Sequence, residues 1–268
     1  MSVQTLYTAA TGLESLETKL DVIANNLANV NTVAFKRDRA NFEDLFYQNE
    51  VLPGSLDATG NPTATGTAIG LGSKVSSVQS EFAQGAFQQT GRELDVAIEG
   101  AGFLQVQDPN TGQVVYTRAG NLSKNALGQL VLGSASTGRL LEPPVTISQD
   151  ATAIVINPDG QVFVQQFGNP QLQQVAQLQL ATFLNPEGLL KLGENLYAQT
   201  DASGDPLPGN PGQDGIGVLR QNFLEASNVE PVQELIDLIT TQRSFELNSQ
   251  AVQAGDEILQ IVTNLRRG

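Results

Sequence analysis

The sequence predicts an α+β fold, in which helical segments at the two ends of the chain flank an inserted, mostly antiparallel β domain. Three observations lead to this prediction. Apolar residues recur every seven residues near both termini, as they do in coiled-coil helices. Between the termini, short alternating apolar runs are separated by turn residues. The 268 residues also include 26 Gly and 12 Pro, which indicates many turns.

The N-terminal helix is predicted by a heptad pattern that has no interruption. All eight of its seam positions are apolar, and most residues between them are polar. Positions three and four apart share a helix face, so the seam forms one narrow apolar stripe that needs a partner surface. The seam residues are Leu6, Ala9, Leu13, Leu16, Leu20, Ile23, Leu27 and Val30.

A second helical pattern fills the C-terminal end. Ser227 and Asn228 are predicted to cap this helix, and Pro231 suits its first turn, where a missing N–H is no loss. We expect this helix to pair with the N-terminal one through Leu238, Phe245, Val252, Leu259 and Val262. Leu235 and Ile258 widen the stripe, and polar residues break its second row, namely Gln242, Ser249 and Asp256.

Composition excludes several classes of function. The balance of 14 basic and 28 acidic residues gives a net charge of −14, which argues against nucleic acid and anionic membranes as partners. The chain has no Cys and no His, so disulfides, imidazole or thiolate metal sites and Ser-His-Asp catalysis are excluded. No apolar run is long enough to span a membrane, and the N-terminus lacks the pattern of a secretory signal peptide.

The middle of the chain reads as strands and loops. Ile154–Ile156 and Val162–Val164 form the clearest hairpin, because Asp159-Gly160 supplies the positive φ of a tight turn. Leu94–Ile98 and Phe103–Val106 are interpreted as a second hairpin. Residues 48–71 have no periodicity and are predicted to be an extended loop. The aromatic residues that precede this loop are expected to pack together as a small junction: Phe35, Phe42, Phe46 and Tyr47.

Candidate chemistry is sparse. The glycines of 66–72 and 212–217 are interpreted as turns, because no strand-to-helix context and no Gly-Lys-Ser/Thr accompanies them. Asp201, Asp205 and Asp214 match no calcium-loop spacing and are interpreted as solvated turn residues. We therefore expect no catalytic site, no cofactor and no bound metal.

Four motifs in order along the chain resemble those of the flagellar basal-body rod and hook proteins of bacteria. The first runs from Ala24 to Arg37, the second from Gln84 to Phe103, and the third from Tyr116 to Gly120. The fourth joins 225–229 to 242–247. The motif residues carried over from the family are Asn25, Asn26, Asn29, Thr32, Phe35, Lys36, Asn228, Gln242, Arg243 and Glu246.

The chain is most similar to the distal-rod branch of this family, which the loop of residues 48–66 sets apart. The resemblance implies a structural subunit that assembles into a rigid hollow helical shaft, transmits motor torque to the hook and lets exported subunits pass through. It implies partners as well: further copies of the chain, proximal rod subunits, the hook protein, the rod cap and the surrounding P- and L-ring proteins. It also implies a periplasmic location reached through the flagellar type III export apparatus, without a cleaved signal peptide.

The same resemblance implies three parts. Residues 1–34 and 226–268 would form a helical polymer core, residues 35–90 and 190–225 a connecting region, and residues 91–189 an outer β domain. Two departures from the family pattern are visible: Ala34 and Asn222 stand where glycine is usual. If these positions need a positive φ, Asn tolerates it and Ala does so less well. The alternatives are a proximal rod or hook subunit of the same family, or a β-rich binding module with helical stalks.

Overall fold

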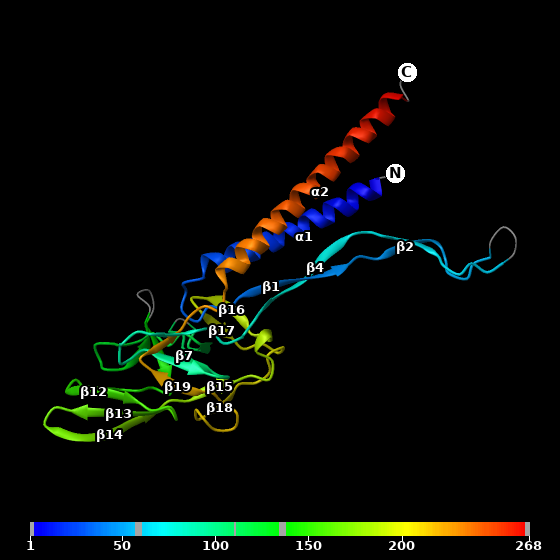
Figure 1. Cartoon of the computed structure of the whole chain (residues 1–268). Helices are drawn as coiled ribbons and strands as arrows, with labels where there is room; N and C mark the ends of the chain where they lie inside the picture. The colour runs from blue at the N-terminus through cyan, green and yellow to red at the C-terminus, as the bar shows by residue number, and fades with distance from the viewer. Residues whose placement is uncertain (1–2, 57–60, 110, 134–137, 266–268) are drawn as a thin grey trace. The chain divides into compact units, whose positions relative to one another are not determined.

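The computed structural model describes residues 3–56, 61–109, 111–133 and 138–265, and it confirms the α+β class. The chain forms two compact units, each built from segments that are distant in the sequence. Unit 1 contains residues 1–28, 38–80 and 230–268, and unit 2 contains residues 29–37 and 81–229. Figure 1 labels both long helices and several of the strands.

Unit 1 consists of two long helices and a long β-hairpin. Helix α1 (Val3–Ala28) and helix α2 (Pro231–Leu265) are the two predicted terminal helices, and Pro231 is the first residue of α2 as expected. The hairpin contains β1 (Asp38–Asp44), β2 (Tyr47–Val51), β3 (Thr67–Gly70) and β4 (Ser73–Ser80). Its strands form two antiparallel ladders, β1 with β4 and β2 with β3. Helix α1 also packs along β1 and β4.

The hairpin corrects two sequence predictions. Residues 48–71 contain the paired strands β2 and β3, although residues 57–60 lie outside the described part of the chain. The ladder forms because main-chain groups can pair whatever the side-chain pattern, so periodicity gives no signal. The expected aromatic junction is also wrong, because the side chains of Phe42, Phe46 and Tyr47 are exposed on the hairpin instead of packed together.

Unit 2 is built from short antiparallel strands. In the described part of the chain its largest sheet has nine strands, in the order β16-β17-β8-β7-β11-β10-β9, with β15 paired to β7 and β18. A three-stranded sheet β12-β13-β14 and the pairs β19–β6 and β20–β5 complete the unit. The elements are β5 (Phe87–Gln89), β6 (Val96–Glu99), β7 (Phe103–Gln107), β8 (Val114–Thr117), β9 (Leu122–Lys124), β10 (Leu130–Leu132), β11 (Arg139–Glu142), β12 (Ala151–Ile156), β13 (Gln161–Gln166), β14 (Asn169–Gln177), β15 (Leu180–Thr182), a 3-10 turn (Pro186–Gly188), β16 (Leu190–Gly193), β17 (Leu196–Ala198), β18 (Leu207–Gly209), β19 (Val218–Gln221) and β20 (Phe223–Glu225).

One of the two predicted hairpins is confirmed and the other is wrong. Strands β12 and β13 pair with Ile156 opposite Val162, and Gly160 has a φ of 85° in the turn between them. Strand β6 pairs instead with β19, more than 100 residues away, while β7 belongs to the large sheet. Both strands of the failed prediction exist, but their pairing is long-range and leaves no local signal.

Two hydrophobic clusters hold unit 2 together. The larger one joins buried aliphatic side chains of the nine-stranded sheet, such as Leu104 and Leu180, to Ile98 of the β19–β6 pair. The smaller one is aromatic and brings together Phe103, Tyr116, Phe183 and Tyr197 with Phe82 at its edge. Four of its five ring pairs meet edge to face, with centroids 4.8–5.8 Å apart, which is a favourable geometry for aromatic rings.

The two departures from the family's glycines both lie where the backbone needs a positive φ. Ala34 has a φ of 55° and Asn222 a φ of 66°. Ala34 is buried, and its N–H donates to the carbonyl of Glu225 at 2.8 Å. The chain therefore places a strained alanine beside the charged junction described below.

Candidate functional site

The two terminal helices lie side by side and run in opposite directions (Figure 1). Three close approaches fix their register: Leu6 lies against Gly255, Gly12 against Asn248, and Asn26 against Glu234. A β-carbon added to Gly255 would come within 2.6 Å of Leu6 Cδ2, so the glycine allows the helices to approach closely at this point. An apolar cavity of about 240 Å³ opens here between the helices, and Leu6 and Leu259 line it.

The structure describes most of the predicted seam residues and corrects some of the predictions. Leu6, Leu13, Leu16, Leu20 and Leu27 of α1 are half-buried and Ile23 is buried; Leu238, Phe245, Val252 and Leu259 of α2 are half-buried. A second row of α2 residues, beside the row of Leu238, also faces α1. Its residues are polar or small: Glu234, Thr241, Asn248 and Gly255. Leu235 and Ile258, expected to widen the seam, are exposed. The side chain of Val262 lies outside the described residues.

Val30 does not belong to α1, which ends at Ala28. The helix stops because Asn29 and Thr32 form a turn: the Thr32 N–H donates to the Asn29 carbonyl, and the Thr32 hydroxyl donates to Asn29 Oδ1 at 3.0 Å. Asn and Thr side chains compete for backbone groups in this way and so end helices.

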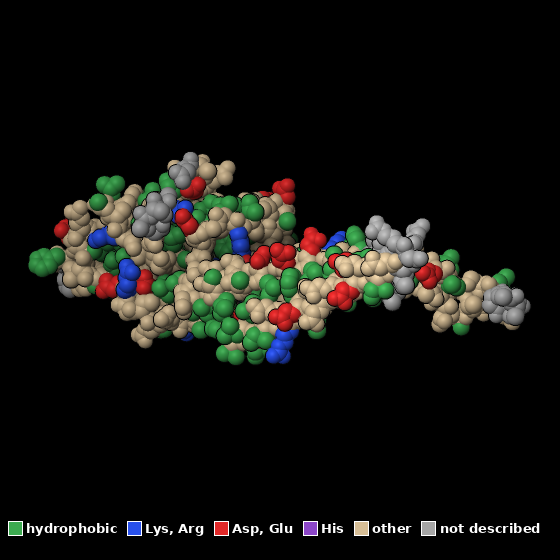
Figure 2. Space-filling view, turned by 90° about the horizontal axis from the view of Figure 1, so that it is seen from above, with side chains coloured by type: hydrophobic (Ala, Val, Ile, Leu, Met, Phe, Trp, Pro, Cys, Tyr) green, Lys and Arg blue, Asp and Glu red, His purple; other side chains and the backbone are tan. Residues whose placement is uncertain are grey.

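A second apolar stripe of α2 faces away from α1. Val232, Ile236, Ile239 and Leu247 recur at spacings of four, three and eight residues, so they share one face, and all are exposed. Three motif residues, Gln242, Arg243 and Glu246, are also exposed on this helix, and within the described residues they make no hydrogen bond or ion pair. Figure 2 shows a face of the molecule on which hydrophobic side chains are interspersed with acidic ones.

Within unit 1, the motif residue Asn26 binds both the hairpin and α2. Its amide donates to the Asp38 carbonyl at 2.8 Å and to Glu234 Oε2 at 3.3 Å, and its Oδ1 accepts from the Asp38 N–H at 2.9 Å. Asn26 and Glu234 are both buried. Asparagine suits this position because its amide group donates from nitrogen and accepts at oxygen at the same time. The neighbouring Asn25 is exposed.

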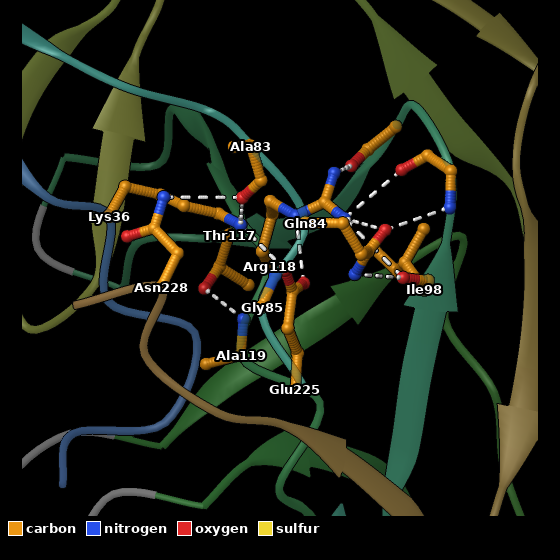
Figure 3. Close-up of polar contacts among 12 residues, drawn as sticks. Lys36, Ala83, Gln84, Gly85, Ile98, Thr117, Arg118, Ala119, Glu225 and Asn228 are labelled. Carbon is orange, nitrogen blue, oxygen red and sulfur yellow. Dashed lines mark hydrogen bonds and ion pairs between the residues drawn. The ribbon is translucent and has the colours of Figure 1, made fainter. Parts of the chain in front are cut away.

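Within unit 2, a buried charged junction joins three distant segments (Figure 3). Glu225 Oε1 lies 2.5 Å from Lys36 Nζ, and Glu225 Oε2 lies 3.0 Å from Arg118 Nε. The side chains of Lys36 and Glu225 are 0% exposed and that of Arg118 is 4% exposed. One carboxylate therefore compensates two buried cations, and the cluster carries a net charge of +1.

Main-chain carbonyls satisfy the remaining donors of this junction. Arg118 donates to the carbonyls of Gly100 and Gly102, both at 3.0 Å, and to Gln84 Oε1 at 3.3 Å. Lys36 Nζ donates to the Ala83 carbonyl at 2.7 Å, and the Gly85 N–H donates to Glu225 Oε1 at 2.9 Å. Burial lowers the pKa of Lys36 from its ordinary 10.5, while the Glu225 carboxylate opposes the shift.

Asn228 completes the junction instead of capping α2. Its Oδ1 accepts from the Arg37 N–H at 2.7 Å, and its amide donates to the carbonyls of Glu81 at 2.8 Å and Ala83 at 3.3 Å. The capping prediction is wrong because these main-chain groups compete for the side chain. The motif residue Phe35 lies nearby, with Lys191 Nζ 5.4 Å from its ring centroid. The sequence motifs contain Lys36, Arg118 and Glu225, but nothing in their spacing indicates that the three meet.

Metal-ion sites and membrane spans were sought among the described residues. Among them, no group of three or more acidic side chains could hold a metal ion. Neither described helix is both long enough and apolar enough to cross a bilayer.

Comparisons with known proteins agree with this geometry. Three family models match the chain: "Flagella basal body rod protein" over residues 6–36, "Flagellar hook protein FlgE/F/G D1 domain" over 97–164, and "Flagellar basal body rod FlgEFG protein C-terminal" over 220–265. The chain is 44% identical to the flagellar basal-body rod protein FlgG of Caulobacter vibrioides, covering 98% of this chain and 100% of the relative. It is 42% identical to that of Agrobacterium fabrum, covering 97% and 98%, and 40% identical to that of Buchnera aphidicola from Schizaphis graminum, covering 98% and 100%.

Proposed function

This chain belongs to the flagellar basal-body rod protein family, and we propose on that premise that it polymerises through its terminal helices into the distal rod. The observation that carries this proposal is the apolar stripe of α2 that pairing with α1 leaves uncovered. Val232 is 71% exposed, and Ile236 and Ile239 are exposed on the same face. A stripe of this kind on a helix that already has a partner is typical of a second protein contact.

The helix pair supplies the rod core in this proposal. The half-buried seam residues hold α1 against α2, while the outer stripe and the exposed Gln242, Arg243 and Glu246 contact neighbouring copies. Non-closing contacts between identical copies give an open helical polymer rather than a ring. We retain residues 1–34 with 226–268 as the polymer core, residues 35–90 with 190–225 as the connecting region and residues 91–189 as the outer wall.

The proposed role is mechanical and involves no reaction and no cofactor. The shaft transmits motor torque to the hook and lets exported subunits pass through its centre. The proposed partners are proximal rod subunits, the hook protein, the rod cap and the P- and L-ring proteins. The rod stands in the periplasm, reached without a cleaved signal peptide.

A double substitution on the outer stripe tests the polymer. Ile236→Glu with Ile239→Glu puts two carboxylates on the uncovered face without touching the α1 side of the helix. We expect it to abolish assembly of the purified chain, as measured by electron microscopy and sedimentation. The circular dichroism signal that unit 2 contributes should stay unchanged. Ile236→Leu with Ile239→Leu is the matched control, since it keeps the face apolar. Filaments from the acidic variant at the wild-type concentration would contradict the proposal.

The β2–β3 hairpin is proposed to stiffen this polymer. It presents Phe46, Leu52 and Leu56 as exposed apolar side chains, suited to contact with a neighbouring copy. Deleting residues 48–66 should give rods that bend, measured as a shorter persistence length in electron micrographs. Rods that remain as straight as the wild type would argue against a stiffening role.

A further inference from the structure

Unit 2 contains a long segment without charge. No Asp, Glu, Lys or Arg occurs in the 27 residues between Asp159 and Glu187. A segment of that length at the chain's average of 16% charged residues would carry about four. The segment forms β13, β14 and β15 and nevertheless exposes large apolar side chains, among them Phe167 and Leu184. Exposed apolar groups without nearby charge are typical of the centre of a protein interface.

Phe167 is an aromatic knob on the surface of unit 2. It occupies the two-residue turn between β13 and β14, next to Gly168, whose φ is 85°. Phe167 is 89% exposed, so nearly all of its surface is open to a partner. Its main-chain N–H donates to the carbonyl of Asp150 at 3.0 Å, which anchors the turn. An aromatic side chain on a fixed turn loses little conformational freedom when it binds.

The same unit has an apolar pocket of about 240 Å³. Three aromatic rings, those of Phe82, Phe103 and Phe183, line it together with Ala101 and Pro186. The rings of Phe82 and Phe103 meet edge to face with centroids 5.5 Å apart. The pocket exceeds the roughly 150 Å³ that suffices for a benzene ring in an engineered cavity of another protein.

The polar wall of this pocket is already satisfied. Arg118 and Gln84 line it, but Arg118 is bonded to Glu225, to Gln84 and to the carbonyls of Gly100 and Gly102. An apolar guest would therefore leave neither Arg118 nor Gln84 without a partner. The pocket suits an aromatic or aliphatic side chain better than a charged ligand.

We propose that Phe167 of one copy inserts into this aromatic pocket of a second copy, as a contact between the β units. The inference rests on the self-assembly proposed above and adds a second contact to it. The occupant is another copy because every copy carries a net charge of −14, and copies repel each other least where acidic side chains are few; the described residues that line the pocket include Arg118 and no acidic side chain. Phe167 lies in the uncharged segment, and so do Thr182, Phe183 and Pro186 of the pocket wall. Because knob and pocket are different surfaces, the contact is heterologous, which is the kind of contact that an open helical polymer requires.

Paired cysteines test the geometry directly, because the native chain has none. Phe167→Cys places a thiol on the turn, and Ala101→Cys places one on the exposed rim of the pocket. Mild oxidation of the assembled double variant should give a ladder of dimers, trimers and longer covalent chains on a denaturing gel. Each single variant should give dimers at most. A double variant that yields no more than the two single variants would overturn the proposal.

Side-chain truncation tests the energetics. Phe167→Ala should raise the protein concentration needed for half-maximal assembly by about tenfold or more, as removal of a central aromatic anchor does. Leu127→Ala is the matched control, because Leu127 is 75% exposed in a turn outside the uncharged segment. It should change that concentration by less than about twofold. Both variants should unfold at the wild-type temperature, since both side chains are exposed.

The outcomes separate this inference from the proposed function. If Phe167→Ala and Leu127→Ala assemble alike while the Ile236/Ile239 acidic variant does not assemble, the knob contact is refuted and the helical polymer stands. If the wild-type chain forms no polymer at any concentration, the proposed self-assembly itself is refuted.

Discussion

Replacing Glu225 with glutamine should be among the most damaging single changes in unit 2. The substitution preserves the shape of the side chain but removes the one carboxylate that, among the described residues, contacts both Lys36 and Arg118. The net charge of the buried cluster then rises from +1 to +2. The new amide also directs a donor toward a site where Lys36, Arg118 and the Gly85 N–H all donate.

The magnitude follows from the burial. Lys36 and Glu225 are fully buried, so solvent cannot screen the charge that remains. Breaking a buried ion pair by removing one partner costs about 3–5 kcal/mol. For a unit of this size that corresponds to a fall in melting temperature of roughly 10 °C. Lys36→Met should cost less, about 1–2 kcal/mol, because it leaves the Glu225–Arg118 pair intact and removes a cation that is desolvated.

Urea unfolding followed by near-ultraviolet circular dichroism measures both losses. The chain has no Trp and four Tyr, and Tyr116 and Tyr197 lie in the aromatic core of unit 2. The double variant Lys36→Met with Glu225→Gln should lose less than the sum of the single losses, because the second change removes one of the cations left unpaired. The reasoning is refuted if Glu225→Gln costs less than Lys36→Met, or if the two losses simply add.

Three further predictions concern the helix pair, the strained backbone and the effect of pH. Gly255→Val should force α2 away from Leu6 and lower the melting temperature of the helix pair. Gly12→Ala should be neutral or stabilising by up to about 1 kcal/mol, because its added carbon meets its nearest neighbour at an ordinary contact distance of 3.4 Å. Thermal unfolding followed by circular dichroism at 222 nm compares the two variants. Ala34→Gly should change the stability of unit 2 by less than about 1 kcal/mol. Relief of about 1–2 kcal/mol of backbone strain is offset by the loss of a buried methyl group and by a more flexible unfolded chain. A shift of the urea midpoint that corresponds to well over 1 kcal/mol would contradict this cancellation. The pKa of Lys36 in the folded chain lies below its ordinary 10.5, so the unfolded chain binds this proton more tightly than the folded chain does. Lys36 should therefore make the free energy of unfolding rise as the pH increases from the folded pKa to 10.5. Urea unfolding measured across this pH range should show the rise in the wild type and not in Lys36→Met.

The terminal helices show how much a repeating pattern can predict. Spacing alone predicts the seam of α1 and the first row of α2, because a narrow apolar stripe indicates the helix face that packs on a partner. The described leucines of both rows are half-buried in the structure. The second row of α2 was misassigned, since Glu234, Thr241 and Asn248 approach α1 although none of them is apolar. Polar and small residues enter a helix interface through specific hydrogen bonds and close approach, and hydrophobic periodicity does not report these.

In the candidate site too, the sequence motifs predict individual residues, whereas only the folded structure shows which of them meet. The motifs contain Asn26, Lys36, Asn228 and, unrecognised as a set, Arg118 and Glu225. Lys36 and Glu225 are 189 residues apart in the chain, and only the folded unit brings them together around Arg118. The capping expectation for Asn228 failed for the same reason, because its partners at Arg37 and Glu81 come from distant segments.

The sequence by itself determined the α+β class, the two terminal helices and the β12–β13 hairpin. Each of these depends on neighbouring residues, whose sterics and hydrogen bonds act over a few positions. Tertiary structure alone decided which strands pair, which side of α2 stays uncovered and which charges share a buried site. Those outcomes depend on contacts between distant segments, and their energy appears only after the chain has closed the loops between them.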